Sequence, residues 1–382
     1  MVKKCIVSPV LISLSLAFFV LSSVEVDAEV PPVFILGDST ADIGTNTHLP
    51  QSPARADVPF NGIDYPHSRP TGSPPSFLYL QNQSSRLKRH ATRGINFASG
   101  GSGILDKTGQ LPKIVSLSEQ IQQFAMVQSN LTVVLGAAET EKLLSRALFF
   151  ISIGSNDIFG YFFTNSTIPK QEFINTLAFA YGIHLKVTLA IYHISLSNGK
   201  MLFFIARLPF AHLFMESRLF LLPQTLYNLG ARKFGIISVP PIGCCPSQRV
   251  KNTTTNGCLE GMNDFARTFY STIHVLLRNL SSQYPGMKYS LGNAYEMTIN
   301  VIEHPQEANF TEVSMACCGA GTLNGEAGCT PKANLCNNRH EFLFWDLFHP
   351  TQAAAKIAAF TLYNGDKRFV TPINFKQLAE DC

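Results

Sequence analysis

The sequence predicts an α/β fold in which a mainly parallel, five-stranded sheet is covered by helices. The first observation is that apolar runs of strand length alternate along the chain with segments of helical periodicity. The second is that polar and glycine-rich motifs directly follow three of these runs, and the loops at such strand ends carry the active groups of parallel sheets. The third is size, because 382 residues, 46% of them apolar, suffice for a large core.

The first 28 residues are predicted to be a secretory signal peptide. Lys3 and Lys4 make a basic start, an apolar stretch follows at 11–21, and Ala28 is a small residue suited to cleavage. The apolar stretch is short for a membrane span. We therefore expect a secreted, extracellular protein whose mature chain covers 29–382, and a buried N-terminal helix is the alternative.

The strand and helix predictions follow from local patterns. Strands are expected at 33–37, 94–98, 147–154, 233–239 and 287–291. A helix at 116–128 opens with Ser116 and Glu119 at the spacing of a capping box. A second helix at 261–280 repeats apolar residues at helical spacing, and Pro350 fits the first position of a last helix. No internal repeat is evident, so a single domain is the simplest interpretation.

Charge and cysteine content narrow the class of protein. The formal net charge of +4 is small for this length, and no dense Lys/Arg tract suggests a nucleic-acid partner. Adjacent cysteines rarely bridge each other, so the two adjacent pairs should bond to partners elsewhere. A metal site is disfavoured because no C-x2-C pair exists. Once Cys5 leaves with the signal peptide, the cysteines predict four disulfides of open connectivity among Cys244, Cys245, Cys258, Cys317, Cys318, Cys329, Cys336 and Cys382.

Six N-x-S/T sequons accompany the signal peptide, which predicts a glycosylated surface. They stand at Asn82, Asn130, Asn165, Asn252, Asn279 and Asn309.

A serine, a histidine and an aspartate stand where a hydrolase would need them. Ser39 follows the first strand in the motif GDS, but a serine hydroxyl is a poor nucleophile until a base takes its proton. Asp346 and His349 are three residues apart, so the carboxylate can hold the Nδ1 proton and leave Nε2 free to face Ser39. Pro350 biases His349 towards an extended backbone. These residues predict nucleophilic catalysis.

Acyl transfer also needs donors aimed at the developing oxyanion. Gly100 offers a backbone N–H, Asn156 a side-chain amide, and Ser39 its own N–H. A structural reading competes with each, because Ser, Gly and Asn are common turn residues. The glycines at 100, 101 and 103 could also form a phosphate loop, but no lysine follows in a G-K-[ST] arrangement. Three further acids, Asp38, Asp42 and Asp157, are expected only to bond neighbouring backbone N–H groups.

Together these motifs resemble the GDSL esterase/lipase family, the plant-type branch of the SGNH hydrolases. The resemblance implies a three-layer α/β/α, flavodoxin-like fold, hydrolysis of carboxylic esters through an acyl-serine, and no metal or organic cofactor. It also covers the segment 238–246 and the adjacent pair Cys317–Cys318. The matching segments are GDSTADIGTN at Ser39, GINFASGGSGIL at Gly100, GSNDI at Asn156, and DLFHPT at Asp346 and His349.

The leading hypothesis is a secreted serine esterase or lipase that acts on small-molecule acyl esters or lipids in lipid metabolism. One alternative is a non-catalytic lipid- or cell-wall-binding glycoprotein on the same fold. Another is a polysaccharide O-acetylesterase, which the same residues could support. Acyl length and leaving group depend on the shape of the pocket.

Two segments depart from the family pattern. After Gly72 a stretch and a helix usual in the family are missing, and residues 47–93 show no clear helical period although a parallel crossover normally needs a helix. Conversely, 187–224 is an apolar insertion that fits no strand–helix alternation. When Lys186 is joined to Thr225, the apolar stripe of the preceding helix continues without a break. We therefore interpret 187–224 as foreign to the fold and a candidate retained intron.

Overall fold

The computed structural model describes residues 31–55, 57–64, 73–108, 113–185 and 225–381, together with the backbone of the short strands β3 (Leu196–Ser197) and β4 (Lys200–Met201). The predicted signal peptide, residues 65–72 and the rest of the insertion lie outside the described residues. No helix in the described part is long and apolar enough to cross a membrane.

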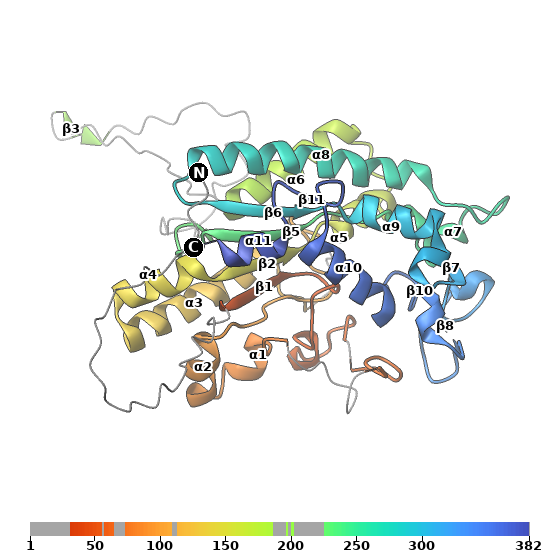
Figure 1. Ribbon diagram of the computed structural model, residues 1–382, viewed down its shortest axis with the longest axis horizontal. Helices are drawn as coiled ribbons and strands as arrows, with labels where there is room; N and C mark the ends of the chain where they lie inside the picture. Colours follow the sequence, from red (N-terminus) through yellow and green to blue (C-terminus); the bar gives the residue numbers. More distant parts are fainter. Residues whose placement is uncertain are drawn as a thin grey trace, which may run out of the picture.

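The described chain forms a three-layer α/β/α structure around one five-stranded sheet, as predicted (Figure 1). Four neighbouring strands are parallel, and the last pairs antiparallel at the edge. In spatial order the strands are β1 (Val33–Gly37), β2 (Leu148–Ser152), β5 (Lys233–Ile237), β6 (Lys288–Gly292) and β11 (Val370–Thr371).

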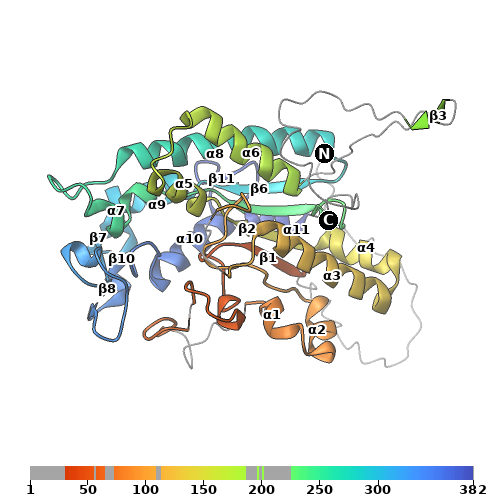
Figure 2. The same ribbon diagram turned by 180° about the vertical axis from the view of Figure 1, so that it is seen from behind.

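Helices cover both faces of the sheet, as the opposite views in Figures 1 and 2 show. On one face, Phe34 and Phe149 are fully buried and contact Phe124 of α3, Phe34 with tilted rings and Phe149 edge to face. On the other face, Phe150 meets Phe375 of α11 edge to face. The first layer contains α3 (Leu117–Leu135), α6 (Lys170–Leu185) and α8 (Glu260–Gln283), and the second contains α10 (Gln352–Asn364) and α11 (Phe375–Glu380).

Most predicted elements are confirmed, and two are corrected. The capping box of Ser116 and Glu119 opens α3. The segment expected as a strand at 94–98 is not a regular ladder strand, because only Asn96 makes β-bridges. It still lies beside β1, where Ile35 N–H donates to the Ile95 carbonyl at 3.0 Å and Phe97 N–H donates to the Ile35 carbonyl at 2.7 Å. The last helix begins after Thr351, whose hydroxyl accepts from the Ala354 N–H, so Pro350 lies before the cap and not in the first turn.

The chain on either side of the insertion is joined by helical hydrogen bonds. Leu226 N–H donates to the carbonyl of His184 at 3.2 Å, and Tyr227 N–H donates to that of Leu185 at 3.3 Å. If residues 187–224 were not counted, both bonds would link residues four apart, as in an α-helix. Leu226 is also buried like Leu185. The described chain therefore re-enters in the register of α6, as though 187–224 had been placed inside one helix.

The first crossover is built from short pieces. Between β1 and the segment at 94–98 the described residues form only the helical turn η1 (Asn46–His48) and the helices α1 (Phe77–Leu80) and α2 (Ser84–Ala91). This agrees with the lack of a clear helical period in that part of the sequence.

Candidate active site

The sequence-predicted residues Ser39, Asn156 and His349 gather at the ends of strands. Ser39 follows β1, and Asn156 lies in the first turn of α5 (Ser155–Phe163), which follows β2. His349 follows β10 (Phe342–Phe344), a short strand that pairs with β7 (Glu312–Ala316) outside the central sheet. All three residues border one cavity of about 1500 Å³.

Ser39, His349 and Asp346 form a hydrogen-bonded chain. His349 Nε2 lies 2.8 Å from Ser39 Oγ, and His349 Nδ1 lies 3.0 Å from both carboxylate oxygens of Asp346. With the proton on Nδ1, the imidazole donates to the carboxylate and its Nε2 can accept the serine proton. This is the arrangement that activates a serine hydroxyl as a nucleophile.

The loop itself fixes the orientation of the acid. Asp346 Oδ1 accepts backbone N–H bonds from Phe348 at 2.9 Å and from His349 at 2.8 Å. Burial alone would raise the pKa of Asp346, but the His349 charge and these hydrogen bonds outweigh it and the pKa is lowered. The Asp346 charge in turn raises the pKa of His349 to about 8. The Asp346 carboxylate therefore stabilises the protonated form of the His349 imidazole.

The oxyanion donors are arranged differently from the sequence prediction. Gly100 N–H donates to Asp42 Oδ2 at 3.0 Å, so this N–H is already bonded, and Gly100 is not among the residues that border the cavity. Its neighbour Gly101 does border the cavity, with a φ of +87° that favours glycine. Within the described residues, the N–H groups of Ser39 and Gly101 have no acceptor.

Asn156 keeps one donor for a ligand. One N–H of its side-chain amide donates to the Ser102 carbonyl at 2.9 Å, which holds the amide beside the glycine loop. An amide has two such hydrogens, so the second remains available at the cavity wall. The free donors are thus Ser39 N–H, Gly101 N–H and Asn156 Nδ2–H.

The acids near these donors accept hydrogen bonds from backbone N–H groups, as predicted. Asp42 accepts from Gly44 N–H at 2.7 Å and Thr45 N–H at 2.6 Å, and Asp38 from Thr40 N–H at 3.0 Å. Asp157 accepts from Ile104 N–H at 2.8 Å, and burial raises its pKa to about 6. These carboxylates hold the loops that carry the donors.

Sequence reasoning missed Gln120, a fully buried residue of α3. Its amide nitrogen donates to the Gly37 carbonyl at 2.9 Å, and its amide oxygen accepts from Gly37 N–H at 2.8 Å. Both backbone groups of the strand end two residues before Ser39 are therefore fixed from the helix layer. The sequence signal that could have identified Gln120 is a polar residue between Leu117 and Phe124 on the buried face of α3.

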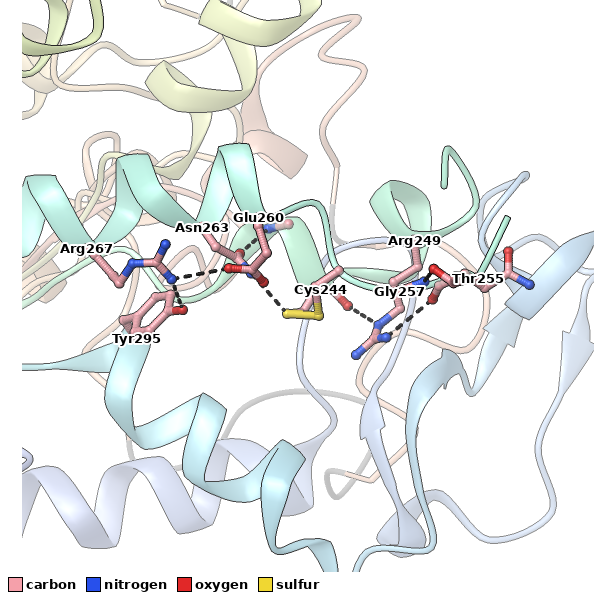
Figure 3. Close-up of a disulfide and its surroundings, with 11 residues drawn as sticks. Cys244, Arg249, Thr255, Gly257, Glu260, Asn263, Arg267 and Tyr295 are labelled. Atoms are coloured by element: carbon pink, nitrogen blue, oxygen red, sulfur yellow. Dashed lines mark hydrogen bonds and ion pairs between the residues drawn. A yellow bond between two sulfur atoms is a disulfide. The ribbon is translucent and has the colours of Figure 1, made fainter. Parts of the chain in front are cut away.

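Three disulfides brace the loops around the cavity. Cys244–Cys258 ties the turn η4 (Ile242–Cys244) to the segment before α8, and Arg249 reaches across to the Cys244 carbonyl at 2.8 Å (Figure 3). The adjacent cysteines Cys317 and Cys318 bond to different partners, as predicted. Those bonds are Cys317–Cys336 and Cys318–Cys329.

The expectation that all eight mature cysteines are paired is wrong for Cys245, which is a free thiol. It is buried in the cavity wall, where its Sγ lies 3.6 Å from the Phe348 carbonyl. Cys382 lies outside the described residues. Burial raises the pKa of the Cys245 thiol to about 12.

Among the described residues, no group of three or more His, Cys, Asp or Glu side chains could hold a metal ion. The chemistry available to the site is that of the serine, the imidazole, the carboxylate and the amide donors.

Comparisons with known proteins show which family the chain resembles. The family model for GDSL-like lipases/acylhydrolases matches residues 33–360. The Arabidopsis thaliana protein GDSL esterase/lipase At5g55050 is 31% identical over 378 residues, which covers 92% of this chain and 90% of the relative. GDSL esterase/lipase 6 and GDSL esterase/lipase LTL1, from the same plant, are 30% and 29% identical and cover 92% and 94% of this chain and 91% and 93% of their own lengths.

Proposed function

Because the chain belongs to the GDSL-like lipase/acylhydrolase family and is a carboxylic ester hydrolase, we propose that it cleaves acyl esters through a covalent acyl-serine at Ser39. The observation that carries the proposal is the contact of 2.8 Å between Ser39 Oγ and His349 Nε2, with Asp346 behind the imidazole.

In the first half-reaction Ser39 Oγ bonds to the ester carbonyl carbon while His349 Nε2 takes the serine proton. The carbonyl oxygen becomes an oxyanion that accepts from Ser39 N–H, Gly101 N–H and Asn156 Nδ2–H. The carbon–oxygen bond to the alcohol then breaks, and His349 gives its proton to the departing alcohol. Asp346 orients the imidazole and stabilises its charged form throughout.

In the second half-reaction water replaces the alcohol. His349 takes a proton from water as the water oxygen bonds to the acyl carbon, and the bond to Ser39 Oγ breaks with return of the proton to the serine. The products are a carboxylic acid and the free enzyme, so no redox partner is needed. Loss of one oxyanion donor typically lowers kcat by about 10²–10³-fold.

The same proposal places the enzyme outside the cell in lipid metabolism. Its support is the signal-like start at 1–28, the even number of mature cysteines with three disulfides, and the six sequons. A binding protein on this fold would have no use for the aligned serine, imidazole and carboxylate, so we do not favour that alternative. Acetylated glycans remain in the test below because an acetyl ester needs the same chemistry.

The test is turnover of an ester panel by the secreted protein. The panel contains p-nitrophenyl acyl esters, a triacylglycerol and an acetylated xylan. Ser39→Ala and His349→Ala should each remove most hydrolysis while secretion continues, and Ser282→Ala, an exposed serine bonded only to its own helix, should leave the rate unchanged. A fluorophosphonate should label the peptide that contains Ser39. Near wild-type turnover by Ser39→Ala would show that the assignment is wrong.

A further inference from the structure

The cavity at the active site is larger than the ester group requires. Its volume of about 1500 Å³ exceeds the roughly 300–1,000 Å³ usual for small-molecule sites. The reacting atoms occupy only the corner where Ser39, Gly101 and Asn156 meet, so most of the space is available for the rest of the substrate.

One part of the cavity, beside α5, opens to solvent. Phe163 is 54% exposed and Ile168 is 46% exposed, although both border the cavity. A group bound there can enter and leave without any rearrangement of the wall.

A second part lies between the sheet and α10, where the lining side chains of the sheet and of α9 (Ala294–Glu303) are half-buried or buried. Phe150 and Ile237 form its floor on the sheet, Met297 of α9, 8% exposed, forms its side, and Ala354 and Ala358 of α10 form its roof. These side chains are apolar, and the polar side chains that α9 and α10 add to the lining are Thr298, Asn300 and Thr361. The crevice therefore suits a mainly apolar ligand.

The crevice is long, and a buried leucine lies at the far end of its roof. Ala354, Ala358 and Leu362 are four residues apart on α10, so the roof extends about 12 Å at 1.5 Å per residue. Leu362 is 5% exposed and packs on Gly292 of β6, where any side chain would collide with it. His349 borders the cavity directly before α10, and Leu362 and Phe369 border it near the other end of that helix.

We infer that this crevice binds the acyl chain of the substrate, and that Ala358 sets the length of chain that the enzyme accepts. The inference rests on the proposed function. The acyl group stays bonded to Ser39 until water arrives, so the less exposed part of the cavity, which can keep its position, suits it. The alcohol must leave before deacylation, and the solvent-open part beside α5 suits that departure. The substrates are therefore esters of medium to long fatty acids.

The experiment compares chain-length profiles of the full chain and of Ala358→Phe. The substrates are p-nitrophenyl acetate, butyrate, octanoate and palmitate, and octyl acetate tests the alcohol side. In the wild type kcat/KM should rise from acetate to octanoate. A phenyl ring at position 358 should lower kcat/KM for octanoate and palmitate by about 10–100-fold, since loss of fit for a few methylenes has this magnitude. Turnover of acetate should stay unchanged, which also shows that the variant is folded.

Two further variants control the result. Lys356→Phe adds the same ring to an exposed position of the same helix outside the cavity, and its profile should match the wild type. Ala358→Leu should lower octanoate and palmitate turnover less than the phenyl variant, and it decides the matter if Ala358→Phe does not fold.

The outcomes separate this inference from the proposed function. If the wild type cleaves no ester and the fluorophosphonate does not label Ser39, the proposed function fails. If the wild type cleaves acetate but neither Ala358 variant alters the length profile, the crevice does not hold the acyl chain. If the variants instead impair octyl acetate and spare octanoate, the crevice holds the alcohol and the inference is overturned.

Discussion

The protonation state of His349 decides whether Ser39 can be activated. Its pKa is raised to about 8 mainly by the Asp346 charge, so at pH 7 the imidazole is mostly protonated and cannot accept from the serine. We predict that kcat/KM rises with pH through about 8 and is about tenfold higher at pH 9 than at pH 7. The stability of the fold should decrease over the same pH range. A group whose pKa is raised on folding stabilises the folded state below its unfolded pKa, and this stabilisation is lost as the pH rises through about 8.

The matched change is Asp346→Asn. Without the carboxylate charge the pKa of His349 should fall, so the midpoint of the pH–rate profile should move to lower pH while the maximum rate drops. The drop should be equal to or smaller than that of Ser39→Ala, because Asp346 does not react. Rates measured from pH 5 to pH 10 check both statements, and an unmoved midpoint would contradict the role given to Asp346.

Gln120 is predicted to act as a positioning residue. Gln120→Met keeps the volume but removes both bonds to Gly37. The buried Gly37 N–H is then unpaired, at a cost of about 1–3 kcal/mol, while the Gly37 carbonyl keeps its bond from the Ser99 N–H at 3.0 Å. We expect kcat to fall. KM and the midpoint of the pH–rate profile should stay unchanged, because Ser39 loses its position whereas His349 keeps it. Gln122→Met, on the exposed side of the same helix, is the control. A pure loss of thermal stability with normal kcat would leave Gln120 only a structural role.

At the residue scale, the sequence predicted the side-chain contacts of the site better than its backbone hydrogen-bond donors. Ser39, Asp346 and His349 could be paired because two of them are three residues apart and the third ends a strand. Gly100 and Gly101 could not be told apart, because they are identical neighbours. Which N–H faces the cavity is decided by Asp42, which lies 58 residues earlier and accepts the bond of Gly100.

The element scale is best illustrated by α6 and the insertion that follows it. We predict that the variant lacking 187–224 folds, keeps ester hydrolysis and is more stable than the full chain. The reason is that Leu226 and Tyr227 already bond to His184 and Leu185 in helical register, while closing a 38-residue loop costs about 3 kcal/mol. Thermal unfolding and ester turnover of both forms measure the difference.

A deletion shorter by one residue is the control for the helical register. Removing only 187–223 leaves one extra residue, which rotates Leu226 by about 100° away from the buried stripe. That variant should be less stable than the one lacking 187–224. Equal stability of the two deletions would contradict the claim of a continuous helix. Separately, a single transcript that retains all 38 codons and yields stable, active enzyme would contradict the interpretation as a retained intron.

Strands were predictable where short runs consist of buried and half-buried residues, as in β1, β2, β5 and β6. The strand β11 was not, because two residues carry no period and its pairing with β6 depends on tertiary contact. Segment 94–98 failed for the opposite reason: it has strand composition, but it makes only single bridges beside β1.

At the scale of the whole molecule, the disulfides lie outside the central sheet. All three close loops between residues 244 and 336, with sequence separations of 14, 19 and 11. Each such loop is worth about 3 kcal/mol in the chain-entropy model. We predict that reduction lowers Tm and loosens the cavity loops first, with protection of amides in β2 and β5 lost only at global unfolding. Hydrogen exchange with and without reductant checks this order, and simultaneous loss of both regions would contradict it.

The free thiol of Cys245 can be used to measure how often the cavity wall opens. The side chain is 4% exposed, so a thiol reagent reaches it only while the cavity wall is open. When closing is faster than labelling, the labelling rate of the Cys245 peptide measures the equilibrium constant for opening. A phosphonate on Ser39 that carries an alkyl chain should slow this labelling, and one that carries only a methyl group should not. The ratio of the two rates gives the free energy with which an occupant holds the wall shut.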